Sequence, residues 1–215
     1  MRYTSVLFDL DGTLLDTLGD LTAAMNRTLT RHGLPERTRQ QMRAALGNGA
    51  RRLMELSVPT GTDSALFETL LAEYNADYAA HCRIGTAPYP GVAALLRTLH
   101  TQGRKLAIVS NKPDEAVRAL RAEFFADAVP IAVGETAAIR RKPAPDMLLA
   151  AMEQLGADPA GTVFVGDSEV DIATARAAGL PCISVLWGFR DRDVLERAGA
   201  QQFAADAGEL ARLLD

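Results

Sequence analysis

Short, continuously apolar runs alternate with amphipathic stretches along most of this chain. Such runs are typical of strands that are buried on both faces of a parallel sheet. The strand-like runs lie at residues 5–8, 105–109 and 162–165, with two weaker ones at 129–133 and 182–186. The helical patterns between them lie at residues 91–100, 113–120 and 144–155. This alternation predicts a doubly wound α/β sheet for the C-terminal part of the chain.

Residues 17–82 interrupt this alternation. The segment contains no strand-like run, and its amphipathic stretches lie at residues 18–32, 36–46, 50–56 and 64–81. The chain then returns to the sheet through residues 85–91, which are rich in glycine and proline, as linkers are. We therefore expect an α/β core formed by residues 1–16 and 83–215. Residues 17–82 are expected to form a helical cap that can open and close on its two connections.

The composition is that of an ordinary globular protein, with 48% hydrophobic and 23% charged residues. The formal net charge of -4 gives no reason to expect binding to nucleic acid or to a membrane surface. No apolar run approaches the roughly 18 residues of a membrane helix, and the N-terminus enters a strand without room for a signal peptide. Cys82 and Cys182 are far apart and are expected to be reduced thiols rather than a disulfide or a metal clip. We therefore expect a cytoplasmic protein.

Polar residues follow the predicted strands. They are Asp9 and Asp11 after residues 5–8, Ser110 and Asn111 after residues 105–109, Asp167 and Asp171 after residues 162–165, and Lys142 in the loop before a helix. Open α/β sheets bind ligands beyond the carboxyl ends of their strands. We therefore expect these side chains to converge on one site.

Each of these residues also has an ordinary explanation. Acidic pairs at strand ends often form turns or cap helices, a serine there often caps a helix, and a single lysine is usually a solvated surface charge. Lys142 is, however, one of three lysines in a chain with 20 arginines, so a flexible point charge stands where arginine is otherwise the rule. Gly12 would allow a tight turn whose amides face an anion. Asp9, Asp167 and Asp171 could together hold a hard cation through oxygen ligands.

Four segments together resemble the motifs of the haloacid dehalogenase superfamily of phosphatases. They are FDLDGTLLDT from Phe8, VSNK from Val109, KP from Lys142 and GDSEVDIATARAAG from Gly166, in the order of that superfamily. The resemblance spans residues 9–179 and implies a Rossmann-like core with a small helical cap between the first and second motifs. It also implies a phosphatase that uses Mg²⁺, a small phosphorylated substrate and an aspartyl-phosphate intermediate.

The resemblance also implies a role for each motif residue. Asp9 would be the nucleophile, and Asp11 would protonate the leaving oxygen and then activate water. Mg²⁺ would be held by Asp9, Asp167 and the backbone carbonyl of Asp11, with Asp171 supporting it through water or Lys142. Lys142 and the metal would let a phosphate dianion approach the carboxylates. The groups that would hold the phosphoryl oxygens are Ser110, Asn111 and the amides from Leu10 to Gly12.

The superfamily includes several chemistries, and the sequence separates some of them. Dehalogenases lack the second aspartate of the first motif, so Asp11 argues against dehalogenation. Phosphonate-cleaving relatives use a cap lysine, and sugar-phosphate mutases usually use a cap lysine and histidine. No lysine precedes Lys105 in this chain, although His32 is available. A phosphatase remains. A non-catalytic phosphate-binding or aspartate-phosphorylated regulator is the alternative from another class, but binding alone does not need Asp11 beside the nucleophile.

The stretch Gly47-Asn48-Gly49 opens a helical pattern that carries Arg51 and Arg52. It is either an ordinary turn between helices or a place where helix amides and an arginine bind a substrate carboxylate. GNGA at this position resembles the phosphoglycolate phosphatases, so 2-phosphoglycolate is the expected substrate, with pyrophosphate, nucleotides and sugar phosphates as alternatives. The sequence leaves a monomer or a homodimer open. Residues 187–189 could belong to the core, the site wall or an interface, with the core as the default.

Overall fold

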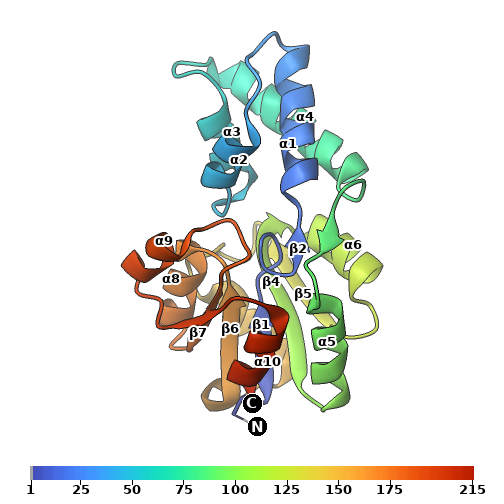
Figure 1. The fold of residues 1–215 in the computed structure, drawn as a ribbon. Coiled ribbons are helices and arrows are strands. Elements are labelled where there is room, and N and C mark those ends of the chain that lie inside the picture. The colour runs from blue at the N-terminus through green and yellow to red at the C-terminus, as the bar shows by residue number, and fades with distance from the viewer. Residues whose placement is uncertain (1) are drawn as a thin grey trace. The chain divides into compact units, whose positions relative to one another are not determined.

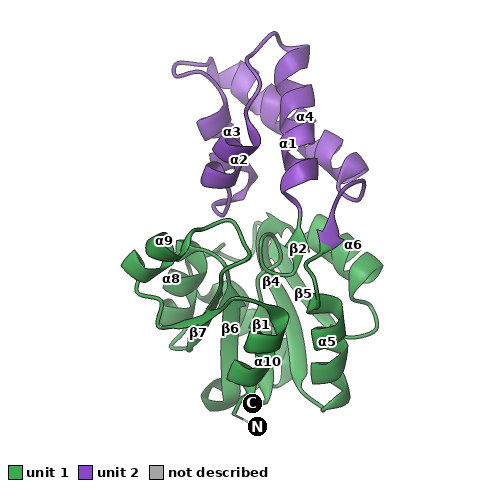
Figure 2. Cartoon of the chain, viewed as in Figure 1, with its two compact units in different colours: residues 1–16, 88–215 green, residues 17–87 purple. Residues whose placement is uncertain are grey.

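The structure is a computed structural model that describes residues 2–215 in two compact units (Figure 2). Unit 1 comprises residues 1–16 and 88–215, and unit 2 comprises residues 17–87. The boundary expected from the sequence, between residues 82 and 83, lies earlier than the boundary between residues 87 and 88 in the structure. The physical reason is Asp20, whose carboxylate accepts hydrogen bonds from the amides of Gly85 and Thr86, each at 2.9 Å. These bonds tie the return segment to unit 2.

Unit 1 is built on a six-stranded parallel sheet with the strand order β5-β4-β1-β6-β7-β8 (Figure 1). Its strands are β1 (Ser5–Phe8), β4 (Lys105–Pro113), β5 (Ile131–Glu135), β6 (Thr162–Gly166), β7 (Cys182–Val185) and β8 (Gln202–Ala204). Phe8, the last residue of β1, pairs with Ile108 of β4 and Val165 of β6. β6 ends one residue further on, at Gly166, whereas β4 continues to Pro113. The sheet confirms the predicted Rossmann-like α/β core.

Helices cover both faces of this sheet. They are α5 (Val92–Thr101), α6 (Asp114–Phe124), α7 (Asp146–Leu155), α8 (Glu169–Ala177), α9 (Arg192–Arg197) and α10 (Ala207–Leu214), with a 3-10 turn, η1, at Pro159–Gly161. Leu7 packs on one face in a cluster with Met147 and Leu148 of α7. Successive strand residues point to opposite faces, so Val6 and Phe8 point to the other face. The helices α5 and α10, which contact each other, lie in front of the sheet in Figure 1.

Unit 2 is helical. Its helices are α1 (Leu18–Arg31), α2 (Arg39–Ala45), α3 (Gly49–Ser57) and α4 (Ser64–His81). The short strands β2 (Leu15–Asp16) and β3 (Ala87–Pro88) lie in the two chain connections between the units. Throughout residues 2–215, each helix is too short or too polar to cross a membrane.

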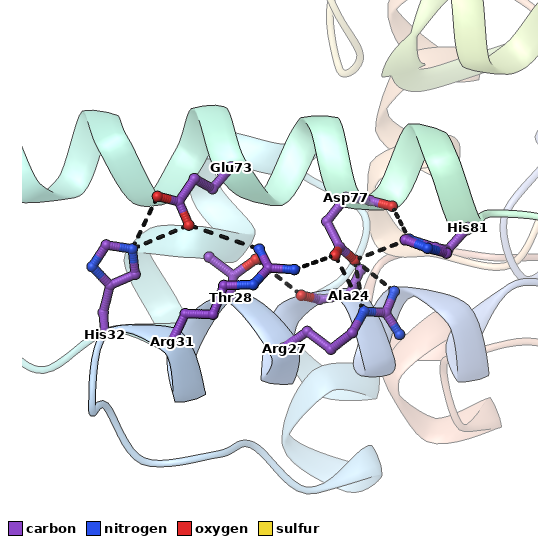
Figure 3. A network of polar contacts seen from close by, with 8 residues as sticks. All are labelled: Ala24, Arg27, Thr28, Arg31, His32, Glu73, Asp77 and His81. Carbon is purple, nitrogen blue, oxygen red and sulfur yellow. Dashed lines mark hydrogen bonds and ion pairs between the residues drawn. The ribbon is translucent and has the colours of Figure 1, made fainter.

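A network of charged side chains joins α1 to α4 (Figure 3). Asp77 of α4, whose side chain is 3% exposed, accepts hydrogen bonds from Arg27 Nε at 2.9 Å and from Arg31 Nη2 at 2.8 Å. Burial by itself raises the pKa of Asp77, but the bonds from Arg27 and Arg31 outweigh it and hold this pKa below its ordinary value. His32 and Glu73 extend the network, with 3.1 Å between His32 Nε2 and Glu73 Oε1. Charge-assisted hydrogen bonds therefore fix this helix pair.

Candidate active site

The structure brings Asp9, Lys142 and Asp171 into one buried group at the carboxyl end of β1. Asp9 directly follows β1, and its amide donates to the carbonyl of Val165 in the neighbouring strand at 2.9 Å. Lys142 Nζ donates to Asp9 Oδ1 and to Asp171 Oδ1, both at 2.7 Å. The side chains of Asp9, Lys142 and Asp171 are 9%, 3% and 1% exposed. Three residues that lie far apart in the sequence therefore share one set of charge-assisted bonds.

Burial decides the electrostatics of this group. It raises the pKa of Asp9 well above the ordinary value, Lys142 partly opposes that rise, and the charges of Asp171 and Asp167 add to it. Burial alone would lower the pKa of Lys142, but the charges of Asp171 and Asp9 outweigh it and raise this pKa. Lys142 is therefore a permanent cation beside the two carboxylates.

Asp171 uses its two oxygens for two different tasks. Oδ1 accepts from Lys142, and Oδ2 accepts from the hydroxyl of Ser168 at 2.6 Å and from the Ser168 amide at 3.1 Å. Ser168 is the N-cap residue of α8, and Asp171 is the third residue of that helix, so the pair forms a capping box. The helix start thus fixes the carboxylate that holds Lys142.

Asn111 and Ser110 lie near the end of β4, and the structure gives Asn111 a partner other than the predicted phosphoryl oxygens. The Asn111 side chain donates to the carbonyl of Lys142 at 2.9 Å and accepts from the Lys142 amide at 2.8 Å. It therefore holds the backbone of the Lys142 loop. Ser110 is buried, and its hydroxyl oxygen accepts weakly from the Lys112 amide at 3.4 Å.

Asp167 follows β6 and is held by the segment at residues 187–189. Its Oδ2 accepts from the Phe189 amide at 2.6 Å, and its Oδ1 accepts from the Thr13 hydroxyl at 3.4 Å. Trp187 Nε1 donates to the Thr13 carbonyl at 2.9 Å. The segment contains the buried Phe189, which agrees with the default core interpretation, and the bond from the Phe189 amide to Asp167 agrees with the alternative of a site wall. Its aromatic-glycine-aromatic pattern after a strand was the available signal.

The turn from Leu10 to Gly12 is tightly packed. Gly12 has φ +87°, and a Cβ at this position would lie 2.3 Å from Asp167 Oδ2. The Gly12 amide, which was predicted to face a phosphoryl oxygen, donates instead to the carbonyl of Leu15 at 2.9 Å. The carbonyl of Leu10 accepts from the Leu14 amide at 3.0 Å, and the Leu10 side chain is completely buried. Glycine at position 12 is therefore what lets this turn approach Asp167.

Asp11 pairs with Lys112, which is not among the candidate site residues predicted from the sequence. Lys112 Nζ lies 3.0 Å from Asp11 Oδ1, and the two side chains are 4% and 20% exposed. The available signal was the scarcity of lysine together with the position of Lys112 directly after Ser110 and Asn111.

Three of the carboxylates could hold a divalent cation. Oxygens of Asp9, Asp167 and Asp171 lie within 4.8 Å of one another, and all three residues are buried. Together with Lys142 they supply three carboxylates and one ammonium, so a dication would balance the charge of this group. Oxygen donors of this kind suit Mg²⁺. The Asp11 carboxylate is not part of this cluster, which leaves its backbone carbonyl as the ligand implied by the resemblance.

The predicted substrate-binding residues of the cap lie at the start of α3 in unit 2. Gly47 and Gly49 have φ +111° and +78°, and α3 begins at Gly49 with Asn48 as its N-cap residue. The Arg51 guanidinium makes two hydrogen bonds to the carboxylate of Glu68, at 2.8 and 2.9 Å, and both side chains are exposed. A substrate carboxylate at Arg51 would therefore compete with Glu68.

The parallel sheet, with buried carboxylates and a lysine at the carboxyl ends of its strands, defines an α/β enzyme with a site suited to phosphoryl transfer. A sequence model of the family described as haloacid dehalogenase-like hydrolase matches residues 6–185. The chain belongs to this family, and it is a phosphoric monoester hydrolase.

Similar proteins support the same class. The N-acetylmuramic acid 6-phosphate phosphatase of Pseudomonas aeruginosa is 34% identical over 217 residues, covering 100% of this chain and 96% of the relative. A phosphoglycolate phosphatase of Xanthomonas campestris is 35% identical over 192 residues, covering 88% of this chain and 86% of the relative. The crystal structure of a candidate phosphoglycolate phosphatase from Lactobacillus delbrueckii matches with a TM-score of 0.94 and 35% identity, covering 100% and 99% of the two chains.

Proposed function

We propose that the protein hydrolyses the phosphate monoester of a carboxylic acid, with 2-phosphoglycolate as the first candidate and Mg²⁺ as cofactor. The observation that carries the proposal is the buried group of Asp9, Lys142 and Asp171 at the end of β1, with Asp167 beside it. A buried carboxylate must be ionised to attack phosphorus, and a cation in contact with it favours that form. Lys142 is such a cation.

The reaction would proceed in two steps on Asp9. In the first step, an oxygen of Asp9 forms a bond to phosphorus while the bond from phosphorus to the ester oxygen breaks, and Asp11 gives its proton to that leaving oxygen. In the second step, a water oxygen attacks phosphorus and passes a proton to Asp11. The bond from phosphorus to Asp9 then breaks, so phosphate leaves and both aspartates return to their starting forms.

The surrounding residues have supporting roles in this proposal. Lys142 and the Ser110 hydroxyl would contact the phosphoryl oxygens as charge develops on them. Asn111 would hold the Lys142 loop in place, because its side-chain amide hydrogen-bonds to the Lys142 backbone. Asp171 orients Lys142 from the start of α8. Mg²⁺, held by Asp9, Asp167 and the carbonyl of Asp11, would neutralise charge on the phosphoryl group.

The names of the relatives point to one substrate chemistry. Phosphoglycolate and N-acetylmuramic acid 6-phosphate are both phosphate monoesters of a carboxylic acid. The turn at residues 47–49, which opens α3 and precedes Arg51, supports a carboxylate contact in unit 2. N-acetylmuramic acid 6-phosphate is the second candidate substrate, because that relative matches the whole of this chain.

Phosphate release in the presence of Mg²⁺ tests the substrate. The panel is 2-phosphoglycolate, N-acetylmuramic acid 6-phosphate, pyrophosphate, a nucleoside monophosphate and a sugar phosphate. We expect kcat/KM for 2-phosphoglycolate to exceed the values for substrates without a carboxylate at least about tenfold, which corresponds to about 1.4 kcal/mol. A flat profile would contradict the substrate assignment and leave the phosphatase mechanism in place.

Asp9→Asn tests the mechanism. Replacing the nucleophile should lower kcat about 10⁴-fold or more on every substrate of the panel. Asp193→Asn, at an exposed aspartate that pairs with Arg197 on the surface, is the matched control and should leave kcat unchanged. Turnover near the wild-type rate in Asp9→Asn would exclude an intermediate on this residue.

A further inference from the structure

Lys112 is a buried lysine that the mechanism above does not use. Its Nζ lies 3.0 Å from Asp11 Oδ1, and its side chain is 4% exposed. Lysine is rarely buried to this extent unless a carboxylate pairs with it. Lys142 stands in the same relation to Asp9. Asp9 and Asp11 are therefore each paired with a different lysine.

The backbone at the end of β4 holds Lys112 in place. The pairing of β4 with β5 shifts in register between Val109 and Pro113, so the strand is irregular where Lys112 lies. Gly134 of β5 packs against this irregular segment, since a Cβ added there would lie 2.9 Å from the Lys112 carbonyl oxygen. The close approach of the two strands leaves the Lys112 backbone little freedom, and its side chain reaches Asp11 from a fixed base.

We propose that Lys112 is a positioning residue, whose ammonium holds the Asp11 carboxylate in the orientation from which Asp11 transfers protons. The inference rests on the proposed function, in which Asp11 protonates the leaving oxygen. An aspartate side chain rotates about two bonds, and a charge-assisted hydrogen bond to one oxygen restricts both. General acid catalysis requires the acid to lie within hydrogen-bond reach of the atom that it protonates. In this proposal, Lys112 keeps Asp11 within that reach and has no contact of its own with the substrate.

Substrates with different leaving groups distinguish a positioning role of Lys112 from a structural role or a contact with the phosphoryl group. As the bond from Asp9 to phosphorus forms, the bond from phosphorus to the leaving oxygen breaks, and an alkoxide leaves readily only if Asp11 delivers its proton to that oxygen. Acetate leaves acetyl phosphate as a stable anion and needs no proton. The ratio kcat/KM reports the steps up to the phosphorylation of Asp9. A misplaced Asp11 should therefore slow an alkyl phosphate and spare acetyl phosphate.

The experiment compares kcat/KM for acetyl phosphate and for the best alkyl phosphate of the panel, with the full chain and Mg²⁺. Asp11→Asn shows the pattern that lost proton transfer produces. We expect Lys112→Met to give that pattern, with about 100-fold loss on the alkyl phosphate and less than about threefold loss on acetyl phosphate. Lys112→Arg keeps a cation and should recover at least about tenfold of the loss. Lys105→Met, at the exposed start of the same strand, is the control and should change neither value.

Equal losses on both substrates in a folded Lys112→Met variant would overturn the inference, since a structural role or a contact with the phosphoryl group would produce them. Circular dichroism establishes folding. If Lys112→Met does not fold, Lys112→Gln takes its place as the variant without a cation, and Lys112→Arg remains the variant that keeps one. The proposed function fails separately: a wild-type protein inactive on both substrates, or an active Asp9→Asn, contradicts the mechanism itself. An active wild type, an inactive Asp9→Asn and an unselective loss at Lys112 contradict this inference alone.

Discussion

At the scale of single residues, the charge state of the site depends on whether a metal is bound. Burial, and then the charge of Asp171, raise the pKa of Asp167 from an ordinary 3.8 to about 7. Between those two values the folded metal-free protein holds a proton that the unfolded chain releases. The free energy of unfolding of the metal-free protein therefore decreases as the pH rises through this window, and Asp9 adds to the effect in the same direction.

We predict that the Tm of EDTA-treated protein falls between about pH 5 and about pH 7.5. Mg²⁺ at about 100 times its Kd should add about 2.7 kcal/mol to the free energy of unfolding. Its effect should be larger at about pH 8 than at about pH 5, because the carboxylates bind metal only when ionised. Thermal unfolding at each pH measures both effects, and Asp167→Asn should weaken both. A metal-free Tm that rises with pH in this window would contradict the prediction.

Gly12→Ala isolates the close approach of the first turn to Asp167. Gly12 and Gly61 have nearly equal φ, +87° and +86°, so alanine costs about 1–2 kcal/mol of backbone strain at either position. Only at Gly12 would the new Cβ collide with Asp167, because nothing lies within 4 Å of a Cβ at Gly61. We expect Gly12→Ala to lower kcat about 100-fold and Gly61→Ala to leave it unchanged. Equal effects on kcat would show that the contact with Asp167 is unimportant.

Single residues also show what the sequence could predict. Asp9, Asp167, Asp171 and Lys142 could be grouped because strand ends in a parallel sheet meet at one edge. The scarcity of lysine could single out Lys112, but not its pairing with Asp11, because the strand is irregular between Val109 and Pro113 and the sequence has no pattern for that irregularity. The hydrogen bonds between the Asn111 side chain and the Lys142 backbone were not predictable either, because a bond to a residue far away in the sequence produces no local sequence pattern.

At the scale of elements, Asp77 is expected to carry much of the attachment between α1 and α4. Asp77→Ala removes charge-assisted bonds to Arg27 and Arg31. Both arginines are partly exposed, so water replaces part of what is lost, and we expect a loss of about 2 kcal/mol in the free energy of unfolding of unit 2. Hydrogen exchange of the amides in α1 and α4 measures it.

The control for Asp77→Ala is Glu68→Ala, which removes an ion pair from the exposed side of the same helix. Both partners of that pair are in contact with water, so exchange in α1 and α4 should not change measurably. Faster amide exchange throughout unit 2 in Glu68→Ala would show that burial does not set the strength of these ion pairs. An exchange rate in Asp77→Ala equal to that of the wild type would show the same.

The predictability of each element followed its environment. β1 and β6 were predicted closely, because burial on both faces makes them continuously apolar. β8 was missed, since it is a three-residue edge strand in which Gln202 and Phe203 are only partly buried. α2 begins at Arg39 rather than at residue 36, because Thr38 and Gln41 form a capping box. That Thr-x-x-Gln pattern was present in the sequence.

At the scale of the whole molecule, the chain leaves unit 1 after its first strand and returns to complete the sheet. The interruption of the strand and helix alternation made a helical insertion predictable. The substrate is not predictable in the same way, because the residues of the proposed phosphoryl site lie in unit 1 and would serve any monoester. Discrimination must come from groups that touch the rest of the substrate, and Arg51 is the candidate that we propose.

Arg51→Met tests this candidate against Arg52→Met, its neighbour on α3, which pairs with Glu55. If Arg51 binds the substrate carboxylate, Arg51→Met should lower kcat/KM for 2-phosphoglycolate at least about tenfold, the lower end for a charge-assisted hydrogen bond. Arg52→Met should leave it unchanged, and neither should affect acetyl phosphate, which carries no carboxylate. Glu68→Gln weakens the competing ion pair and should lower KM for 2-phosphoglycolate. Equal kcat/KM in both arginine variants would place carboxylate recognition elsewhere, without bearing on Asp9.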